Sequence, residues 1–441
     1  MHKINYIVTS LLLLAFIGSG RAQSNFPTDS LELSEVIRRV IQNYPSILIA
    51  EQEIAFADAR IGLAKSDYLP QLNFSASYTR LGPVSSMDIP GMGTFQLYPA
   101  DNYEMGVNVH QLITDFGRTS KRVNLEKQNK QLSQLSVEQL KQQLSLSLLN
   151  YFYSMLYLQE AIKIKNEELK TLGEHLVFVE KKEATGSSTQ YAVLSTQVRI
   201  SATENQRVDL ETSLQVLQAQ MNSFLGNKPT QPVTVKEKLW EPVALESDEK
   251  LIESAYQQRE ELKVVRQRSD MASARLSLAS ASLYPVLDLF ASGGFKNGYI
   301  IGTNPNLNRF TPNYAAGVSL KWNFFDGNRI KYYRQEAQSE INRVEQDKEL
   351  ISRNIANEII ENRTHLDAAF KKIQQQELQL RQAQRAYELA QTSFMAGTVT
   401  NLDLLDSETA LAESRLALMK SKIDYTVNLL KLKIAMGEQI Y

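Results

Sequence analysis

Short segments in which polar and apolar residues alternate occur at four places in the chain. In the first, at about residues 71–80, Leu72, Phe74, Ala76 and Tyr78 occupy every second position, and the residues between them are polar. The same alternation recurs at about 102–113, 286–295 and 313–324. Because the side chains of a strand point alternately to its two faces, this pattern predicts β-strands with one apolar face. Each segment has about the 10 residues of a tilted strand that crosses a membrane.

Two other stretches have the period of long helices. From Ile355 to Phe394, apolar or small residues recur at alternating steps of four and three, and the pattern resumes from Leu402 to Leu430. This heptad seam predicts two helices that fold back on each other at a turn around Gly397. The helix that begins near residue 329 would be roughly 100 Å long, at about 1.5 Å per residue. A hairpin of that length must pack against other hairpins, in its own chain or in other chains.

Shorter helices are predicted before each pair of strands, at residues 34–67 and 248–282. The low glycine and proline counts, 19 and 12, agree with a largely helical chain. In the first of these helices, the sequence Asn43-Tyr44-Pro45 predicts a break or kink, because proline cannot donate a helical hydrogen bond. The second is expected as one helix from Asp248 to Ser282.

The predicted elements form one unit that is present twice. Residues 57–72 and 272–287 are identical at seven of sixteen positions, at an offset of 272 − 57 = 215. From Tyr103 and Tyr314 onward the offset is 314 − 103 = 211, and it is still 211 at Gly226 and Gly437. The long hairpins of the two copies therefore have equal lengths, and a difference of four residues lies between residues 81 and 102.

This duplication defines the predicted organisation of the chain. The first repeat comprises residues 23–226, with a hairpin tip near 186, and the second comprises residues 248–441, with a tip near 397. Residues 227–247 form a linker between them. Pro229, Pro232 and Pro242 keep this linker from continuing the helix.

Residues 1–22 are predicted to be a signal peptide. Lys3 precedes an apolar stretch from Ile7 to Ile17, and small residues precede a predicted cleavage point after Ala22. An uncleaved anchor helix is the alternative, but the apolar stretch is shorter than the about 20 residues that span a bilayer. We therefore expect an exported protein.

The composition excludes several classes of function. The chain has no cysteine, which excludes disulfide scaffolds, thiol catalysis and a lipidated N-terminal cysteine. Its four histidines are too dispersed for a local metal motif, and no catalytic set or phosphate loop stands out, so we expect neither an enzyme nor a bound cofactor. The net charge of −1 argues against nucleic acid as a partner.

The four alternating segments are too few to close a membrane barrel within one chain. An open sheet edge in lipid leaves backbone groups unpaired at several kcal/mol each, and the smallest bacterial barrels have about 8 strands. Two or more chains must therefore contribute strands to one barrel, and the helical hairpins would continue from it as a coaxial tube. This arrangement predicts a conduit. A soluble, exported coiled-coil scaffold with small β-hairpins is the contrasting hypothesis.

Several of these segments together resemble the TolC-type outer-membrane efflux proteins. The stretch Ala396–Asp406 is similar to the second hairpin tip of that family and to the helix start after it. The turns Asp115-Phe116-Gly117-Arg118 and Asp326-Gly327-Asn328-Arg329 resemble its junction of strand and long helix. The resemblance covers about residues 31–437.

This resemblance implies a mainly α-helical fold with transmembrane β-strands. Its duplicated unit of helix, strands and long helical hairpin would form a homotrimer, with a 12-stranded β-barrel in the outer membrane of a Gram-negative cell and an α-helical tunnel in the periplasm. It also implies outer-membrane lipid, a periplasmic adaptor protein and an inner-membrane pump of RND or ABC type as partners. The expected function is the outer-membrane duct of a tripartite export system for small molecules such as drugs. A type I protein-secretion duct is the alternative, since pump and adaptor select the cargo.

The resemblance also suggests candidate site residues. The hairpin tips, with Gly186, Thr189, Gly397 and Thr400, would contact the adaptor, although a glycine there can simply end a helix. Asp403 and Asp406 lie three residues apart on one helix face and would line the periplasmic aperture. The alternative for these acids is a solvated position near a helix N-terminus, where the dipole favours them. The candidate strand-to-helix turns contain Asp115, Gly117, Arg118, Asp326, Gly327 and Arg329.

Overall fold

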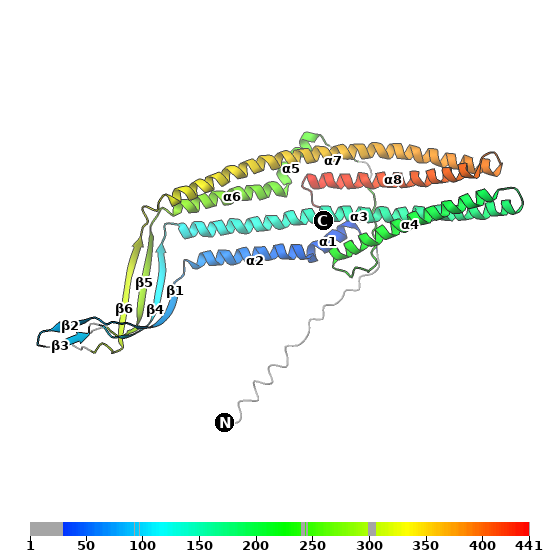
Figure 1. Ribbon diagram of the computed structural model, residues 1–441. Helices are drawn as coiled ribbons and strands as arrows, with labels where there is room; N and C mark the ends of the chain where they lie inside the picture. The colour runs from blue at the N-terminus through cyan, green and yellow to red at the C-terminus, as the bar shows by residue number, and fades with distance from the viewer. Residues whose placement is uncertain are drawn as a thin grey trace, which may run out of the picture.

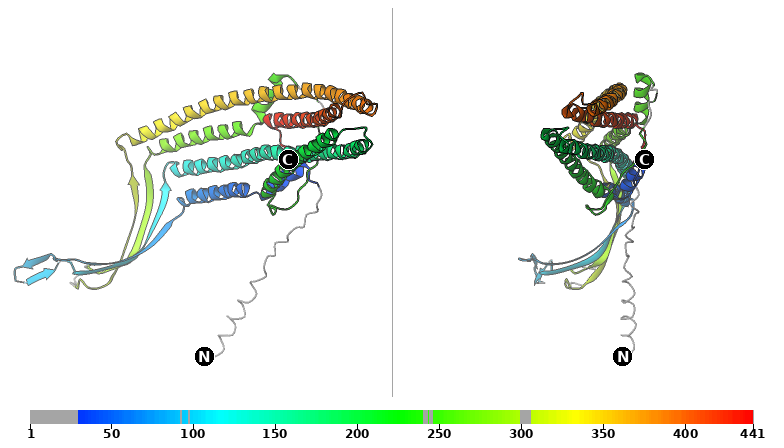
Figure 2. Two further views of the ribbon diagram at one scale, coloured as in Figure 1. Left: turned by 45° about the vertical axis from the view of Figure 1, so that its right-hand side comes forward. Right: turned by 90° about the vertical axis from the view of Figure 1, so that its right-hand side faces the viewer.

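A computed structural model describes residues 30–91, 93–96, 98–239, 243, 246–298 and 306–440. The described chain is a long bundle of helices with a four-stranded sheet at one end and two hairpin tips at the other (Figure 1). The strands curve away from the direction of the helices (Figure 2). The predicted signal peptide, residues 1–22, lies outside the described residues.

The helices of the two repeats correspond one to one. The first repeat has α1 (Leu33–Asn43), α2 (Pro45–Ser66), α3 (Arg118–Ala184) and α4 (Gln190–Leu225). The second has α5 (Asp248–Gln258), α6 (Glu260–Ala281), α7 (Arg329–Met395) and α8 (Asn401–Ala435). Their starts differ by 248 − 33 = 215, 260 − 45 = 215, 329 − 118 = 211 and 401 − 190 = 211. The long helices α3 and α7 each have 67 residues.

Each long helix folds back on the helix that follows it, as the heptad pattern predicts. The pairs α3–α4 and α7–α8 form the two antiparallel hairpins, and α8 also packs along α3 (Figure 1). Near the sheet, α3 lies between α2 and α6. None of the helices in the described ranges carries an apolar stretch long enough to cross a bilayer.

The main sheet is antiparallel, with the strand order β1-β4-β5-β6. Its strands are β1 (Gln71–Arg80), β4 (Asp101–Thr114), β5 (Val286–Lys296) and β6 (Thr311–Lys321). Gly106 and Gly294 face each other across β4 and β5. A Cβ on Gly294 would lie 2.1 Å from the Met105 carbonyl oxygen, so only glycine fits this close approach. The repeats are therefore joined in one continuous sheet.

The loop between β1 and β4 contains a second, smaller sheet. Strands β2 (Ser86–Ile89) and β3 (Gly93–Gln96) form an antiparallel hairpin at the far end of the molecule (Figure 1). This hairpin was not predicted, because strands of four residues are too short to show a period. This hairpin lies where the four-residue difference between the repeats occurs.

The prediction of one continuous helix from Asp248 to Ser282 is wrong. The helix breaks at Arg259, whose backbone is extended, with φ −59° and ψ 128°. Arg259 is the repeat counterpart of Tyr44 (259 − 44 = 215), where Pro45 causes the predicted break between α1 and α2. The second repeat breaks at the same position without a proline.

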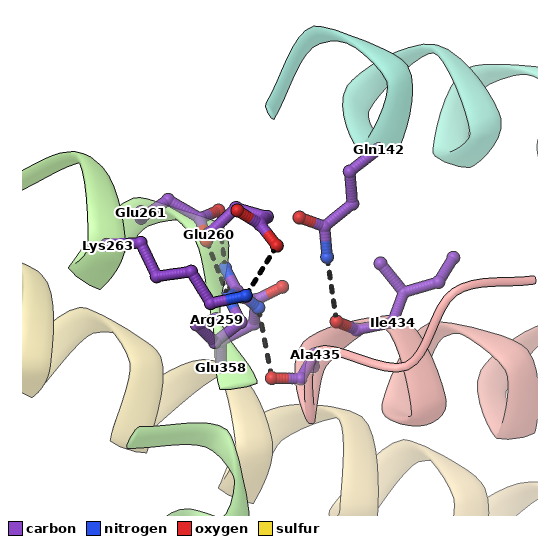
Figure 3. Close-up of polar contacts among 8 residues, drawn as sticks. All are labelled: Gln142, Arg259, Glu260, Glu261, Lys263, Glu358, Ile434 and Ala435. Atoms are coloured by element: carbon purple, nitrogen blue, oxygen red, sulfur yellow. Dashed lines mark hydrogen bonds and ion pairs between the residues drawn. The ribbon is translucent and has the colours of Figure 1, made fainter. Parts of the chain in front are cut away.

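Tertiary contacts of Arg259 hold the break between α5 and α6. Its side chain is only 8% exposed and forms ion pairs of 2.9 Å with Glu261 and with Glu358 of α7. It also donates a hydrogen bond of 3.1 Å to the carbonyl oxygen of Ala435, at the end of α8 (Figure 3). These partners compensate the loss of hydration of a buried guanidinium. The arginine thereby connects α6, α7 and α8.

The apolar core lies midway along the molecule, where the two hairpins meet. One cluster joins α1, α3, α4 and α8 around Ile37, Leu148 and Phe152. A second cluster joins α5, α7 and α8 around Ile359 and Leu429. The linker closes the first cluster through Val233 and Val235, and a parallel bridge connects Leu31 to Val235. This core fixes the two hairpins to each other, and their tips extend beyond it.

Candidate functional site at the hairpin tips

The two hairpin tips have the same backbone geometry. Gly186 and Gly397 adopt the left-handed conformation, with φ of +76° and +75°. In both tips the glycine N–H donates back three residues and the next N–H donates back five, which is the Schellman ending of a helix. An added Cβ on either glycine would have no described atom within 4 Å. These glycines therefore end their helices, and their outer side is open.

Threonines begin the helices that follow the tips. Thr189 accepts a hydrogen bond from the Ala192 amide, and Thr400 accepts one from the Asp403 amide. At the second tip, the Asp403 carboxylate also accepts hydrogen bonds from the Thr400 hydroxyl (2.6 Å) and amide (2.9 Å). This reciprocal pair is a capping box, and the Thr400 hydroxyl and amide lower the pKa of the Asp403 carboxyl.

The two candidate acids have different partners. Asp403 turns back to the tip, whereas Asp406 forms an ion pair of 2.7 Å with Arg199 of α4. The Asp406 side chain is 62% exposed. Both acids lie at the start of α8, as the sequence indicates, and each carboxylate has a partner of its own. An aperture would form only where several copies of the chain assemble, so the position of these acids around it stays a prediction.

Asn401 joins three helices next to the tips. Its Oδ1 lies 2.7 Å from Nε2 of His175 on α3. Its Nδ2 lies 3.1 Å from the carbonyl oxygen of Ala192 and within 3.2 Å of the hydroxyls of Ser195 and Thr196, all on α4. Burial lowers the pKa of His175, and the hydrogen bond to Asn401 partly opposes this. One amide on α8 thus bridges both helices of the first hairpin.

Sequence reasoning did not single out Asn401, His175 or Arg199. No local signal marks them. The counterparts of His175, Asn401 and Arg199 are Ala386 (175 + 211), Gln190 (401 − 211) and Ala410 (199 + 211), but the repeats differ at nearly every aligned position of α4 and α8. A difference between the repeats therefore does not identify a contact between the hairpins.

The strand-to-helix turns cap the long helices. The buried carboxylate of Asp115 accepts hydrogen bonds from the amides of Gly117 (3.0 Å) and Thr119 (2.6 Å) at the start of α3. Asp326 accepts one of 2.9 Å from the Ile330 amide at the start of α7. Gly117 and Gly327 have φ of +92° and +70°, the conformation that lets the chain turn sharply.

The arginines of these turns behave differently. Arg118 donates hydrogen bonds to the carbonyl oxygens of Ser282 (3.4 Å) and Tyr284 (3.1 Å), and so ties α3 to the end of α6. Arg329 is exposed and has no hydrogen-bond partner in the part of the chain that the structure describes. The described ranges also contain no group of acidic and histidine side chains that could hold a metal ion.

A duplicated chain with strands of membrane-crossing length at one end and matching helical hairpins at the other has the architecture of a subunit of an export channel. The family model described as "Outer membrane efflux protein" matches residues 36–227 and 251–438. The chain therefore belongs to the outer membrane efflux protein family. This membership confirms the resemblance to TolC-type proteins and the expected location in the outer membrane.

Individual relatives agree over nearly the full length. The chain is 24% identical to the outer membrane protein TolC of Vibrio cholerae over 435 residues, which covers 97% of this chain and 95% of that protein. It is 24% identical to the pyoverdine export outer membrane protein OpmQ of Pseudomonas putida, over 88% of this chain and 81% of that protein. It is 22% identical to the putative multidrug resistance outer membrane protein MdtQ of Escherichia coli, over 83% of this chain and 77% of that protein.

Solved structures have the same fold. The outer membrane protein VceC of Vibrio cholerae superposes with a TM-score of 0.73 at 19% identity, covering 93% of this chain and 97% of that chain. CusC superposes with a TM-score of 0.76 at 18% identity, covering 94% and 96%.

Proposed function

We propose that three copies of this chain form the outer-membrane duct of a tripartite export system. The strands of three copies close a 12-stranded barrel surrounded by outer-membrane lipid, and the helical hairpins continue it as a tunnel into the periplasm. In this role the chain is a conduit and not an enzyme. The exported molecules pass along the shared axis from the hairpin tips to the sheet.

The observation that carries this proposal is the pair of open edges of the main sheet. β1 and β6 are its outer strands, and within the described ranges each has one neighbouring strand. Leu72 and Phe74 of β1 are 67% and 72% exposed in a single chain. An open edge in lipid costs several kcal/mol for each unpaired backbone group. Pairing of β6 in one copy with β1 in the next removes this cost and closes the sheet.

The duplication supplies a register for that pairing. Val107 of β4 is paired with Gly293 of β5 inside the chain. Their counterparts are Val318 (107 + 211) and Tyr78 (293 − 215). Val318 is therefore expected opposite Tyr78 of the partner subunit. This register supports a ring in which every junction between neighbouring repeats has nearly the same geometry.

The correspondence between the repeats also predicts hydrogen-bond partners for Arg329 in the partner subunit. Arg118 donates to the carbonyl oxygens of residues 282 and 284. Its counterpart Arg329 would then donate to the corresponding carbonyl oxygens of Asp67 and Leu69 (282 − 215 and 284 − 215) in the partner subunit. A guanidinium that lacks a partner among the described residues of one chain gains two in the ring, which supports an assembly of several copies.

The tips are the proposed contact of the duct with the adaptor protein, and an inner-membrane pump of RND or ABC type would supply the cargo. Three copies present six tips with nearly equal backbone geometry. The names of OpmQ and MdtQ refer to pyoverdine export and to multidrug resistance. These names support small molecules as the cargo class.

Membrane fractionation and native mass measurement test the assembly. We expect the mature protein in the fraction with outer-membrane density, and a mass of three chains after extraction in detergent. A monomer that is released without detergent would contradict the proposal.

A further inference from the structure

Glu408 is an acidic residue buried between the two hairpins. It lies on α8, two turns from the second tip, and is only 5% exposed. Its Oε1 atom is buried and has no hydrogen-bond partner among the described residues. An ionised carboxylate in such a place would lose its hydration without compensation. The geometry therefore favours the neutral, protonated side chain.

A neighbouring buried ion pair does not neutralise Glu408. Lys165 and Glu168 of α3 form a buried ion pair of 2.8 Å, with side-chain exposures of 7% and 3%. Thr203 of α4 donates a hydrogen bond of 3.4 Å to the other oxygen of Glu168. Glu168 and Glu408 line the same cavity of about 80 Å³. The buried charged side chains of this cluster are therefore two carboxyl groups and one ammonium group, and the ammonium group of Lys165 is paired with Glu168.

The surrounding cations have carboxylate partners of their own. Arg199 of α4 is paired with Asp406 at 2.7 Å, and Arg415 of α8 is paired with Glu167 of α3 at 3.2 Å. From α7, the phenol of Tyr387 lines the cavity beside Glu408. From α3, Glu174 and His175 share a second cavity with Glu408, of about 190 Å³.

We propose that Glu408 is a proton-binding site, and that the proton it holds lets α8 pack against α3 and α4. Loss of the proton places a second negative charge beside Glu168 and weakens this packing. The proton-binding site itself does not depend on the proposed function. An effect of the proton on export does rest on the proposed function, because the packed region is next to the tips that would contact the adaptor.

The direction of the pH effect follows from the pKa of Glu408. Burial, and secondly the Glu168 carboxylate, raise this pKa from its ordinary value to about 8, and Arg199 opposes the rise. Between the ordinary value and pH 8, the packed state binds more protons than a state in which Glu408 reaches water. The packing is therefore strongest at low pH and weakens as the pH rises toward 8.

The repeats identify a suitable variant. The counterpart of Glu408 in the first repeat is Gln197 (408 − 211), so a glutamine already stands at this place in the other hairpin. Glu408→Gln keeps the shape of the side chain and removes its titration. Glu413→Gln changes an exposed acid on the same helix and is the matched control.

Infrared difference spectroscopy of the purified full-length protein between pH 6 and pH 9 tests the proton directly. We expect a carbonyl band of a protonated carboxylic acid that disappears with a midpoint near pH 8. The band should be absent in Glu408→Gln and unchanged in Glu413→Gln. In Glu168→Gln the midpoint should fall, because the repelling charge is gone. A band that persists in Glu408→Gln, or that titrates below pH 6, would overturn the proposal.

Hydrogen exchange of the segment 401–412 tests the packing. Comparing wild type with Glu408→Gln at each pH cancels the intrinsic pH dependence of exchange. We expect the protection of the wild type relative to Glu408→Gln to be higher at pH 6 and several-fold lower at pH 9. Glu413→Gln should follow the wild type. A ratio that stays constant across this pH range would show that the proton does not control the packing.

Discussion

Arg199 of α4 and Asp406 of α8 form a 2.7 Å ion pair that joins the two hairpins next to their tips. Asp406 is one of the two candidate aperture acids, and this pair partly balances its charge within its own chain. Because the Asp406 side chain is 62% exposed, the contribution of this pair to stability is expected to be at most about 1 kcal/mol. Removing this charge is therefore expected to change the ion selectivity at the tips while changing the free energy of unfolding little.

The aperture hypothesis predicts altered ion selectivity. In planar bilayers, the double variant Asp403→Asn and Asp406→Asn should show reduced preference for cations and weaker block by multivalent cations, since acidic rings attract cations. The difference should shrink as salt increases, because the charges are exposed. Glu345→Gln, which alters an exposed acid far from the tips, is the control. Unchanged selectivity at low salt would mean that the two acids serve only as helix-start residues.

The adaptor hypothesis predicts a loss of export from bulky tip residues. Gly397→Trp should abolish export of a fluorescent dye from cells, while the trimer still reaches the outer membrane. Gly397→Asn is the control, because asparagine tolerates the left-handed backbone at this position. Normal dye export by the tryptophan variant would argue against docking at this tip.

The register between subunits predicts one specific crosslink. The chain has no cysteine, so the pair Tyr78→Cys and Val318→Cys introduces the sole thiols. Directly opposed residues on neighbouring strands have Cβ atoms roughly 5 Å apart, so oxidation should yield a covalent trimer on a denaturing gel. Phe74→Cys with Val318→Cys lies four residues out of register and should react poorly. Equal yields from both pairs would refute the register.

The proposed topology predicts that the loops at residues 81–101 and 296–312 face the cell exterior. Gly91 lies in the turn between β2 and β3, at the end of the molecule opposite the helices (Figure 1). A peptide tag inserted after Gly91 should bind antibody on intact cells. A tag in the linker, after Lys228, should bind only after permeabilisation. Reversed accessibility of the two tags would show that the orientation is wrong.

The helix break at Arg259 predicts a stability effect. Arg259→Ala leaves Glu261 and Glu358 without their cation and removes the hydrogen bond to Ala435, so the free energy of unfolding should fall by about 2–4 kcal/mol. Lys263→Ala removes the more exposed ion pair to Glu260 and should cost at most about 1 kcal/mol. Thermal unfolding of the two variants tests this difference. Equal losses would mean that the Arg259 contacts do not stabilise the break.

Features that are encoded locally could be predicted from the sequence. The heptad seam leads to the α7–α8 hairpin, and Pro45 marks the start of α2. Membership of the efflux family could be predicted from the order of the turns and tips along the sequence. In each case neighbouring residues carry the information, because periodicity and proline act within a few positions.

Features that depend on contacts distant in sequence could not be predicted. Arg259 breaks a helix through partners on α7 and α8, and no local residue indicates this. Asn401 was part of a recognised stretch, but its three-helix contact depends on how the hairpins pack. Helical spacing placed Asp403 and Asp406 on one face of α8, but it could not indicate the capping contact of Asp403 or the ion pair of Asp406 with Arg199 of α4.

The equal length of α3 and α7, 67 residues each, restricts how this protein can evolve. One residue inserted into α7 alone would advance its tip by about 1.5 Å and rotate it by roughly 100° relative to the tip of α3. The contacts between α7 and α8 would also shift by one residue. A lineage can therefore lengthen or shorten the tunnel only by coordinated insertions in both arms of both repeats. The distance from the outer membrane to the tips should accordingly change in rare, discrete jumps among descendants of this gene.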